Sequence, residues 1–413
     1  MSPRIAPGIC LSPGRYNPDV TVLSFADTRF PIERANGAQT MATCQALAAR
    51  GHDVTLVVRP NPTGRQGDPF RFYGVPATRG LRLHFVPTSR GRLASRLRFL
   101  GAAVRLARDR GGLVYTRDLG LASLLLAWPR ALPVRVVYES HGVAPVVREE
   151  LPRLLGTPAL APSASKLRRL DRRERRVWTR AHAYVTITQA LADELTSRYG
   201  RRQRVFVVPD GAPPADPTGA ADAGPPPTAR PVAAYAGHLY PWKGVDVFVR
   251  ALALAPEVDG LIVGGHPGES DLARITTLAR EVGVADRLEI TGLVRPADVA
   301  SRLAPASFLV LPNTASAMSD RYTSPLKLFE YLRLGRAIVA SDLTAIREVL
   351  ADEETALLVP PGDAQALAEA LRRLAADPVL AIALGHRARA LAARFTWTAR
   401  ASRLEAALLA ARS

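Results

Sequence analysis

Residues 324–335 read SPLKLFEYLRLG and lead into the apolar run AIVAS at residues 337–341. Ser324 suits the N-cap of a helix, Pro325 suits its first position, and Gly335 suits the residue just past its end. These signals predict a short helix that precedes a strand. Because the first N–H groups of a helix lack internal partners and the helix dipole is positive there, we expect this N-terminus to bind an anion.

Two side chains of this helix indicate which anion fits. Lys327 adds positive charge beside the N-terminus, which favours a phosphate or a diphosphate. Glu330 follows about one turn later, and its carboxylate would repel a bare anion unless it holds another part of the same ligand, such as a pair of hydroxyls. A nucleotide with a diphosphate and a ribose meets both conditions. The alternative is an ordinary amphipathic helix that contacts no ligand.

Strand-like apolar runs alternate with helical patterns from end to end, which is typical of α/β proteins with parallel sheets. A chain of 413 residues exceeds what one core usually supports, so we expect two domains. The Pro-, Gly- and Ala-rich stretch 212–230 is the expected linker. Strands are predicted at 20–25, 53–58, 113–115, 134–138, 184–187 and 205–208 before it and at 232–236, 260–263, 288–291, 308–311, 337–340 and 356–359 after it, and a further strand at 81–86 is left open.

Glycine-containing loops follow the predicted strands of the second half. Residues 237–244, GHLYPWKG, place Lys243 next to a glycine and just before a helical pattern. Gly264 and Gly265 end the next strand, and a turn at 291–294 ends the one after it. Ligands of parallel sheets bind at this edge, although a solvated lysine and simple tight turns are the structural alternatives.

Two candidate residues of the first half also follow strands. His141 lies in YESHG at residues 138–142, and the pair Asn36-Gly37 is expected to form a turn between the first strand and the first helix. A lone histidine at a strand end is more often a structural residue than a functional one. His141 remains a candidate site residue because it follows a predicted strand, and ligands of parallel sheets bind beyond the carboxyl ends of the strands.

In this order, the motifs resemble those of the retaining glycosyltransferases of family 4, which carry a Ser-Pro-x-Lys-x-x-Glu-Tyr-x-x-x-Gly signature in their nucleotide-sugar domain. The resemblance runs from Asn36 to the closing FTW at 395–397 and so covers nearly the whole chain. It implies the GT-B fold, an α/β architecture with two Rossmann-like domains facing each other across a cleft. The implied parts are an acceptor-side domain over 1–211, the linker, a nucleotide-sugar domain over 231–385, and a last helix over 386–413 that crosses back to the first domain.

The resemblance also implies roles for individual residues. Lys243 would neutralise the leaving diphosphate, Glu330 would hold the ribose, and His141 would lie beside the donor sugar and the acceptor; these are the expected catalytic residues. No side chain is assigned as a general base. The other implied substrate-binding residues are Asn36, Gly37, Gly237, His238, Gly264, Gly265, Val294, Ser324, Pro325, Leu326 and Lys327.

Two positions depart from the family pattern. The fuller motif has two glutamates separated by seven residues; Glu330 matches the second, but Tyr322 stands at the first, which contacts the donor sugar in relatives. We expect Asp320 or the backbone amides of 325–327 to replace that contact. His238 stands where relatives often carry arginine, so the charge at this position depends on pH.

The resemblance implies a bacterial-type retaining glycosyltransferase of the hexosyltransferase kind. It would move a sugar from a nucleoside diphosphate sugar to an acceptor that the sequence does not identify: a lipid-linked molecule, a polysaccharide or a small metabolite. The nucleotide sugar is a co-substrate, and no cofactor is expected. Two alternatives stay open: a non-catalytic nucleotide-sugar-binding homologue that acts as a partner subunit, and a sugar-nucleotide epimerase.

The formal net charge of +18 is compatible with anionic substrates, an acidic membrane surface or nucleic acid. No nucleic-acid-binding motif accompanies it, and an aromatic content of 6% supplies few stacking platforms, so no nucleic acid is expected as partner. The predicted helix at 165–180 is rich in arginine, with Asp171 and Glu174 interspersed on the same outward face. We interpret this face as solvated, with contact to an anionic membrane as the alternative.

Metal sites and membrane spans are not indicated by the sequence. The seven histidines are scattered, and Cys10 and Cys44 form no metal-ligand spacing, so no protein-bound metal is expected. The longest apolar stretch, at 119–128, is about half of what a bilayer crossing needs. The N-terminal residues lack the apolar region of a signal peptide. We therefore expect a cytoplasmic protein, with peripheral attachment at the inner face of the membrane as an option.

Overall fold

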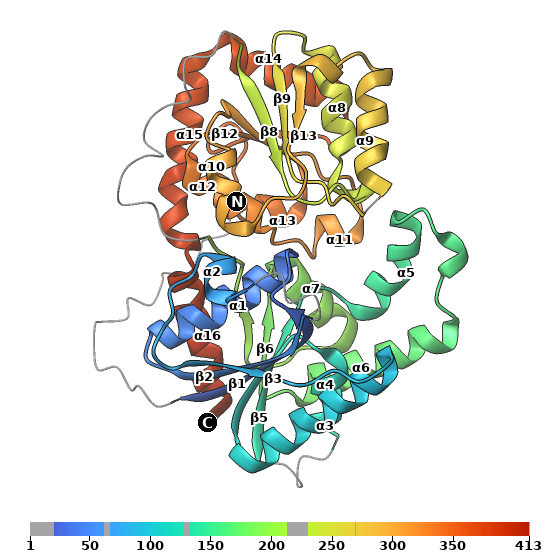
Figure 1. Ribbon diagram of the computed structural model, residues 1–413, viewed down its shortest axis with the longest axis vertical. Coiled ribbons are helices and arrows are strands. Elements are labelled where there is room, and N and C mark those ends of the chain that lie inside the picture. Colours follow the sequence, from blue (N-terminus) through green and yellow to red (C-terminus); the bar gives the residue numbers. More distant parts are fainter. Residues whose placement is uncertain (1–19, 62–66, 128–132, 213–229, 269, 413) are drawn as a thin grey trace.

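The computed structural model describes residues 20–61, 67–127, 133–212, 230–268 and 270–412. Two α/β halves lie one above the other, each built on a parallel sheet that helices cover on both faces (Figure 1). This architecture confirms the expected fold class. Every strand predicted from the sequence forms, and the segment that was left open at 81–86 adds one more. The expected linker over 212–230 lies outside the described residues except at its two ends.

The lower half in Figure 1 contains a seven-stranded sheet with the order β3-β2-β1-β4-β5-β6-β7. The order reverses between β1 and β4, and in such sheets ligands bind beyond the strand ends near this switch point. The strands are β1 (Thr21–Phe30), β2 (Asp53–Pro60), β3 (Leu81–Phe85), β4 (Gly112–Thr116), β5 (Val134–Ser140), β6 (Ala183–Thr186) and β7 (Val205–Val207). The helices are α1 (Ala35–Ala49), α2 (Pro69–Tyr73), α3 (Arg92–Arg110), α4 (Leu119–Leu125), α5 (Ala144–Leu154), α6 (Ala164–Arg180) and α7 (Gln189–Tyr199).

The upper half repeats the same design with six strands in the order β10-β9-β8-β11-β12-β13. Here the switch point lies between β8 and β11. The strands are β8 (Val232–Ala236), β9 (Asp259–Val263), β10 (Leu288–Ile290), β11 (Phe308–Leu311), β12 (Ala337–Ser341) and β13 (Leu357–Val359). The helices are α8 (Val245–Leu254), α9 (Ser270–Glu281), α10 (Val299–Arg302), α11 (Ala317–Asp320), α12 (Leu326–Leu334), α13 (Thr344–Arg347), α14 (Ala364–Ala376) and α15 (Pro378–Ala392).

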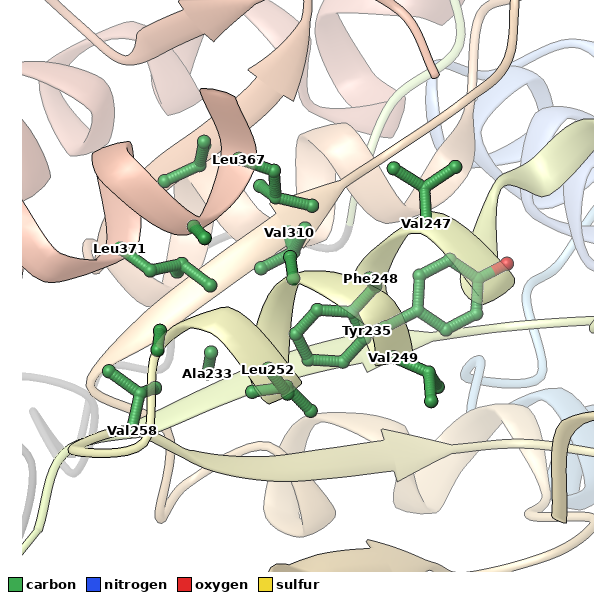
Figure 2. Packing of buried hydrophobic residues seen from close by; sticks show 14 of the residues in the cluster. Ala233, Tyr235, Val247, Phe248, Val249, Leu252, Val258, Val310, Leu367 and Leu371 are labelled. Carbon is green, nitrogen blue, oxygen red and sulfur yellow. The ribbon is translucent and has the colours of Figure 1, made fainter. Parts of the chain in front are cut away.

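The core of the upper half supports the loops that follow its strands. Phe248 and Leu252 of α8 pack with Tyr235 of β8 and with Leu371 of α14, and all four side chains are buried (Figure 2). Close packing of this kind fixes the position of β8 relative to α8. The loop that joins them, residues 237–244, therefore has two rigid ends.

The chain returns to the lower half at its end. Helix α15 packs on α12 and β12, and after a short 3-10 turn at Ala393–Phe395, helix α16 (Trp397–Arg412) packs on α1 and on β4 to β7. Figure 1 shows the two red helices running from the upper half to the lower one. The crossing thus begins near residue 393, and the expected boundary at 386 falls inside α15, whose buried Leu384 and Ala388 hold it to the upper half.

A buried arginine anchors the returning helix. Arg400 of α16 has a side chain that is 1% exposed, and its Nη1 donates to the carbonyl oxygens of Val208 and Pro209 at 2.8 and 2.9 Å. Its Nη2 pairs with the Glu139 carboxylate at 2.5 Å, and Asp210 lies 3.3 Å from Nη1. Burial alone would raise the pKa of Glu139, but the charge of Arg400 and the bond from its other neighbour His141 outweigh it and hold the pKa well below its usual range.

Two expectations about helix starts prove wrong. Helix α12 has Pro325 as its N-cap and begins at Leu326, because the Ser324 hydroxyl accepts a hydrogen bond from the Asp210 amide at 2.9 Å instead of capping the helix. Gly335 ends the helix as predicted, with φ of 64°. Asn36 and Gly37 do not form a turn between strand and helix; they lie in the first turn of α1.

The charged face of α6 also differs from the expected pattern. Glu174 was placed among the solvated charges, yet it is fully buried and accepts hydrogen bonds from the Tyr184 hydroxyl at 2.8 Å and from the Ala144 amide at 3.0 Å. Burial raises the pKa of Glu174 to about 7. The carboxyl therefore ties α6 to the first residue of α5, three positions after His141.

Replacing Arg400 with leucine should strongly destabilise the protein, because Glu139 and Asp210 would remain buried without their cation. We expect the free energy of unfolding to fall by about 3–5 kcal/mol. Urea denaturation followed by circular dichroism measures this. Leucine at the exposed Arg250 of α8 is the matched control and should change stability by less than about 0.5 kcal/mol. A loss at Arg400 no larger than the control's would contradict the anchoring role.

Candidate functional site

The candidate site lies where the two halves face each other. Helices α11 and α13 of the upper half lie above α7, and α5 reaches up beside α11 (Figure 1). Glu150 of α5 accepts from the amides of Ala317 and Met318 at 2.9 and 3.1 Å, and Arg321 pairs with Glu194 of α7 at 2.9 Å. These contacts bring the strand ends of both sheets to one interface. Every motif singled out from the sequence follows one of these strand ends or lies near it.

Two lysines lie near each other in the upper half, close enough for the charge of Lys243 to act together with burial in lowering the pKa of Lys327. Lys243 ends the 3-10 turn at Pro241–Lys243, and Lys327 lies in the first turn of α12. The Nζ of Lys327 is shielded from solvent and, within the described part of the chain, has no hydrogen-bond partner; it lies 3.6 Å from the ring centroid of Tyr235. Such a buried cation is expensive unless an anion joins it.

The pKa values of both lysines reflect this arrangement. Burial lowers the pKa of Lys243 to about 8. The pKa of Lys327 lies well below its usual range, mainly because the amine is buried and secondly because the positive charge of Lys243 is near. The negative charge of Glu330 acts in the opposite direction, but its effect is smaller. Burial also raises the pKa of the Glu330 carboxyl, which Lys327 and Arg333 oppose. A bound anion would restore the charge of both lysines.

Glycines allow the loops of this site to approach one another. A Cβ at Gly264 would lie 2.1 Å from the carbonyl oxygen of Gly237, and a Cβ at Gly244 would lie 1.7 Å from that of Pro312. A Cβ at Gly237 would lie 3.1 Å from the Lys327 Nζ. Gly237, Gly244 and Gly264 have φ of 127°, 66° and 146°, which L side chains rarely adopt. The predicted residues Gly237, Gly264 and Lys327 are thus brought together.

Three aromatic rings form a stack in the loop at 237–244. His238 and Tyr240 have ring centroids 4.9 Å apart with planes 4° from parallel, and Tyr240 and Trp242 are 4.7 Å apart at 19°. Tyr235 donates a hydrogen bond to the His238 carbonyl oxygen at 2.6 Å. Sequence reasoning did not single out Tyr240 and Trp242, although three rings at every second position were a visible signal.

In the lower half, His141 rests on the carboxylate that Arg400 holds. Its Nε2 lies 2.6 Å from Glu139 Oε1, and its side chain is 24% exposed. Because a carboxylate only accepts, Nε2 carries the hydrogen and Nδ1 is left as an acceptor. Burial, and after it the charge of Arg117, lower the pKa of His141, so the ring is neutral at pH 7. Sequence reasoning did not assign roles to Glu139 and Arg400: Glu139 lies within YESHG, but its partner Arg400 is 261 residues away and carries no motif.

The remaining predicted residues occupy different positions. Asn36 is exposed, while Gly37 is buried because the Tyr73 hydroxyl packs against it, 2.4 Å from where a Cβ would lie. Gly265 follows β9 with φ of 108°. Val294 packs against the core between the sheet and α12. Nothing in the geometry brings Asn36 or Val294 next to the lysine pair.

Tyr322 stands at the position of the missing glutamate and serves the contact between the halves. Its side chain is buried in the core cluster of the lower half, and a Cβ at Gly142 would lie 3.0 Å from its ring. Next to it, the Thr188 hydroxyl donates to the Arg321 carbonyl oxygen at 2.5 Å. Asp320, an expected replacement for the sugar contact, accepts instead from the Thr344 amide at 2.9 Å.

Two further properties concern metals and membranes. Among the described residues, no group of three or more His, Cys, Asp or Glu side chains is placed to hold a metal ion. No helix in the same part of the chain is long and apolar enough to cross a membrane.

Comparison with known proteins relates this architecture to curated sequences. Residues 36–211 match the family model of a glycosyl transferase 4-like domain, and residues 230–377 match that of the glycosyl transferases group 1. D-inositol 3-phosphate glycosyltransferase of Nocardia farcinica is 30% identical over 240 residues, which are 54% of this chain and 51% of that protein. Alpha-D-kanosaminyltransferase of Streptomyces kanamyceticus is 27% identical over 155 residues, 37% of this chain and 38% of the relative. The chain thus spans about half the length of the first curated relatives it matches, or less.

Solved structures share the whole architecture. Sucrose-phosphate synthase from Thermosynechococcus elongatus has a TM-score of 0.75 at 20% identity, with 94% of this chain and 98% of that chain covered. Anabaena HepE in complex with UDP-glucose has a TM-score of 0.69 at 17% identity, with 94% and 99% covered. At such identity the likeness shows the fold alone. Since the two family models together cover most of the chain and the GT-B architecture is in place, the chain belongs to the glycosyltransferases built from a 4-like domain and a group 1 domain.

Proposed function

We propose that this chain transfers a sugar from a nucleoside diphosphate sugar to an acceptor, with retention of the anomeric configuration. The observation that carries the proposal is the pair formed by Lys327, in the first turn of α12, and Lys243, in the loop before α8; the shielded Lys327 amine has no hydrogen-bond partner in the described part of the chain. A diphosphate supplies the missing negative charge. Retention rests on the family 4 signature at residues 324–335.

The proposed mechanism stabilises the departing diphosphate. As the bond between sugar and phosphate breaks, negative charge grows on the diphosphate oxygens. Lys243, Lys327 and the N–H groups of the first turn of α12 lie ready to receive it, so no reorganisation is needed at that moment. Glu330, one turn along the same helix, would accept from the ribose hydroxyls.

His141 has a positioning role in this proposal. Its neutral ring offers Nδ1 as an acceptor while Glu139 holds the opposite nitrogen. The ring can therefore accept from a hydroxyl of the donor sugar or of the acceptor. The stacked rings of His238, Tyr240 and Trp242 lie in the loop that carries Lys243, where a flat face can pack against a sugar or a base.

The donor class is supported by the names of related structures. HepE was solved with UDP and with UDP-glucose, and starch synthase IV of Arabidopsis thaliana with ADP and acarbose. UDP, UDP-glucose and ADP all contain a nucleoside diphosphate, but the base is uracil in the first two and adenine in the third. The relative named for D-inositol 3-phosphate indicates a small polar molecule as one acceptor class, beside lipid-linked and polysaccharide acceptors.

One observation favours a second candidate function. Tyr322 lies in the contact between the halves, and the donor-sugar glutamate of relatives is absent there. A partner subunit that binds nucleotide sugar without turnover would tolerate this loss. Product analysis by mass spectrometry separates the candidates: a transferase forms a glycosylated acceptor, a partner subunit forms no product, and an epimerase converts the donor without acceptor.

We also propose that the lower half contacts an anionic membrane surface. All seven arginines of α6 are exposed, and Leu93 and Leu97 of α3 are 72% and 60% exposed. Basic and apolar side chains on one half of a protein are typical of peripheral membrane binding. The four α6 arginines chosen for charge reversal are Arg168, Arg169, Arg172 and Arg173.

A thermal-shift panel tests the donor site. UDP, GDP, ADP or dTDP at about 100 times its Kd should stabilise the parent protein by about 2.7 kcal/mol. Lys243→Met, Lys327→Met and Glu330→Gln should each reduce or abolish this gain. Arg250→Met, in an exposed helix of the same half, is the control and should keep it. No stabilisation of the parent by any diphosphate would exclude the proposed donor site.

Diphosphate binding should weaken as the pH rises above about 8. The free protein loses the proton of Lys243 near that pH, and a bound diphosphate favours the charged form, so binding takes up a proton. Affinity of the parent should fall by up to about tenfold per pH unit between 8 and 10. Calorimetry at pH 9 in two buffers of different ionisation heat gives the proton count. Equal proton uptake by the parent and by Lys243→Met would refute this assignment.

Vesicle flotation tests the membrane surface. The parent should float with vesicles that contain phosphatidylglycerol and remain unbound to neutral vesicles at low salt. Charge reversal of the four α6 arginines to glutamate should abolish flotation. Reversal at exposed arginines of the upper half, Arg250, Arg280 and Arg302, should leave it intact. Failure of the parent to float would end the proposal.

A further inference from the structure

A second cavity opens on the other face of α12. It has a volume of about 210 Å³ and lies between the ends of β6 and β7, the segment 323–329 and the crossing at Ala393–Phe395. Leu328 and Phe329 of α12 line it, whereas Lys327 and Glu330 of the same helix do not. Ser324 and Pro325, which precede α12, line it as well. The hinge cavity, as we call it, therefore shares the start of α12 with the proposed donor site but does not include the lysine pair.

Two arginines give the hinge cavity its charge. Arg394 and Arg403 both line it, and their guanidinium carbons lie 5.9 and 5.7 Å from the ring centroid of Phe395, which also lines it. Arg394 is exposed at the surface. The Nη1 of Arg403 is shielded from solvent and, in the described ranges, has no hydrogen-bond partner. Burial, and after it the charges of Arg394 and Arg400, lower the pKa of Arg403.

The described lining holds two arginines and one carboxylate. Glu348 is that carboxylate, and its two oxygens accept from the amides of Gln189 and Ala190 at 2.7 and 2.8 Å instead of pairing with Arg394 or Arg403. Asp210 follows the lining residue Pro209 in sequence, but it pairs with Arg400. The described lining therefore carries an excess of one positive charge, with one shielded donor of Arg403 unused.

The size of the hinge cavity restricts what can fill it. Sites for drug-sized ligands measure about 300–1,000 Å³, so a nucleotide sugar is too large for 210 Å³. Guanidinium groups recognise the oxygens of phosphate and carboxylate through paired hydrogen bonds. The apolar walls formed by Val207, Phe329 and Phe395 would accept the carbon body of a small ester.

We propose that the hinge cavity binds a small phosphate or phosphate monoester through Arg403 and Arg394, at a site distinct from the donor site. Its walls come from the lower half, from α12 and α13 of the upper half, and from the crossing segment. A ligand there touches all three parts and stabilises the arrangement in which the halves face each other. The same helix α12 then carries one anion on each face.

Titration of the full chain with inorganic phosphate tests the hinge site. Isothermal calorimetry on the parent should show saturable binding, and Arg403→Gln should weaken it about tenfold or more. The double variant Lys243→Met/Lys327→Met removes phosphate binding at the donor site but should keep a saturable phosphate site, and adding Arg403→Gln to it should weaken that remaining site, because the two lysines do not line the hinge cavity. Glucose 6-phosphate should bind at least as tightly as phosphate if the apolar walls hold the carbon body.

Melting temperatures of the variants show whether a loss of phosphate binding comes from the missing side chain or from an unfolded protein. Without ligand, Arg403→Gln should melt close to the parent's temperature, because the substitution removes a shielded donor that lacks a hydrogen-bond partner and loses only the contact with the Phe395 ring. If Arg403→Gln does not fold, Arg394→Gln at the exposed rim should still weaken phosphate binding. Three results would overturn the proposal. Loss of phosphate binding only in the lysine variant would assign the anion to the donor site. Absence of saturable binding by the parent, or equal binding by all variants, would show that the two arginines do not hold phosphate.

Discussion

The carboxylate of Glu139 lies between side chains that come from distant parts of the chain. Arg400, 261 residues later, donates to one oxygen, and His141, two residues later, bonds the other. Burying these ions is favourable only because each finds its partner inside the lower half. The pair fixes α16 on the first sheet and holds the neutral ring of His141 in one orientation. The position of the histidine thus depends on the last helix of the chain.

A contrasting principle governs α12. Lys327 on one face, and Arg403 beside the other, are shielded cations for which the described residues provide no hydrogen bond. The surrounding loops and helices shield the Lys327 Nζ and the Arg403 Nη1 from water, although neither residue is fully buried. Such positions lower the stability of the empty protein and favour anion binding, so stability and ligand binding are opposed here. Figure 1 shows why α12 can serve both sites: it lies close to the junction of the two halves.

Tyr322 belongs to the contact between the halves. A charged side chain would be costly in the apolar cluster that Tyr322 joins beside Gly142. The aromatic ring adds apolar contact to the polar bonds made by Glu150 and Arg321. The segment just before α12 is thus part of the junction.

The sequence by itself determined the α/β class, the strands, the end of α12 at Gly335 and the loops that follow the strands, because hydrophobic period and glycine geometry are local properties. Only the tertiary structure decided that Ser324 bonds Asp210 instead of capping α12, that Glu174 is buried, and that Arg400 and Arg403 carry structural and candidate binding roles. An arginine in a chain with 55 Lys and Arg residues carries no local mark of burial. Its partners lie as far as 261 residues away, and only packing determines which cation meets a carboxylate and which is left without one.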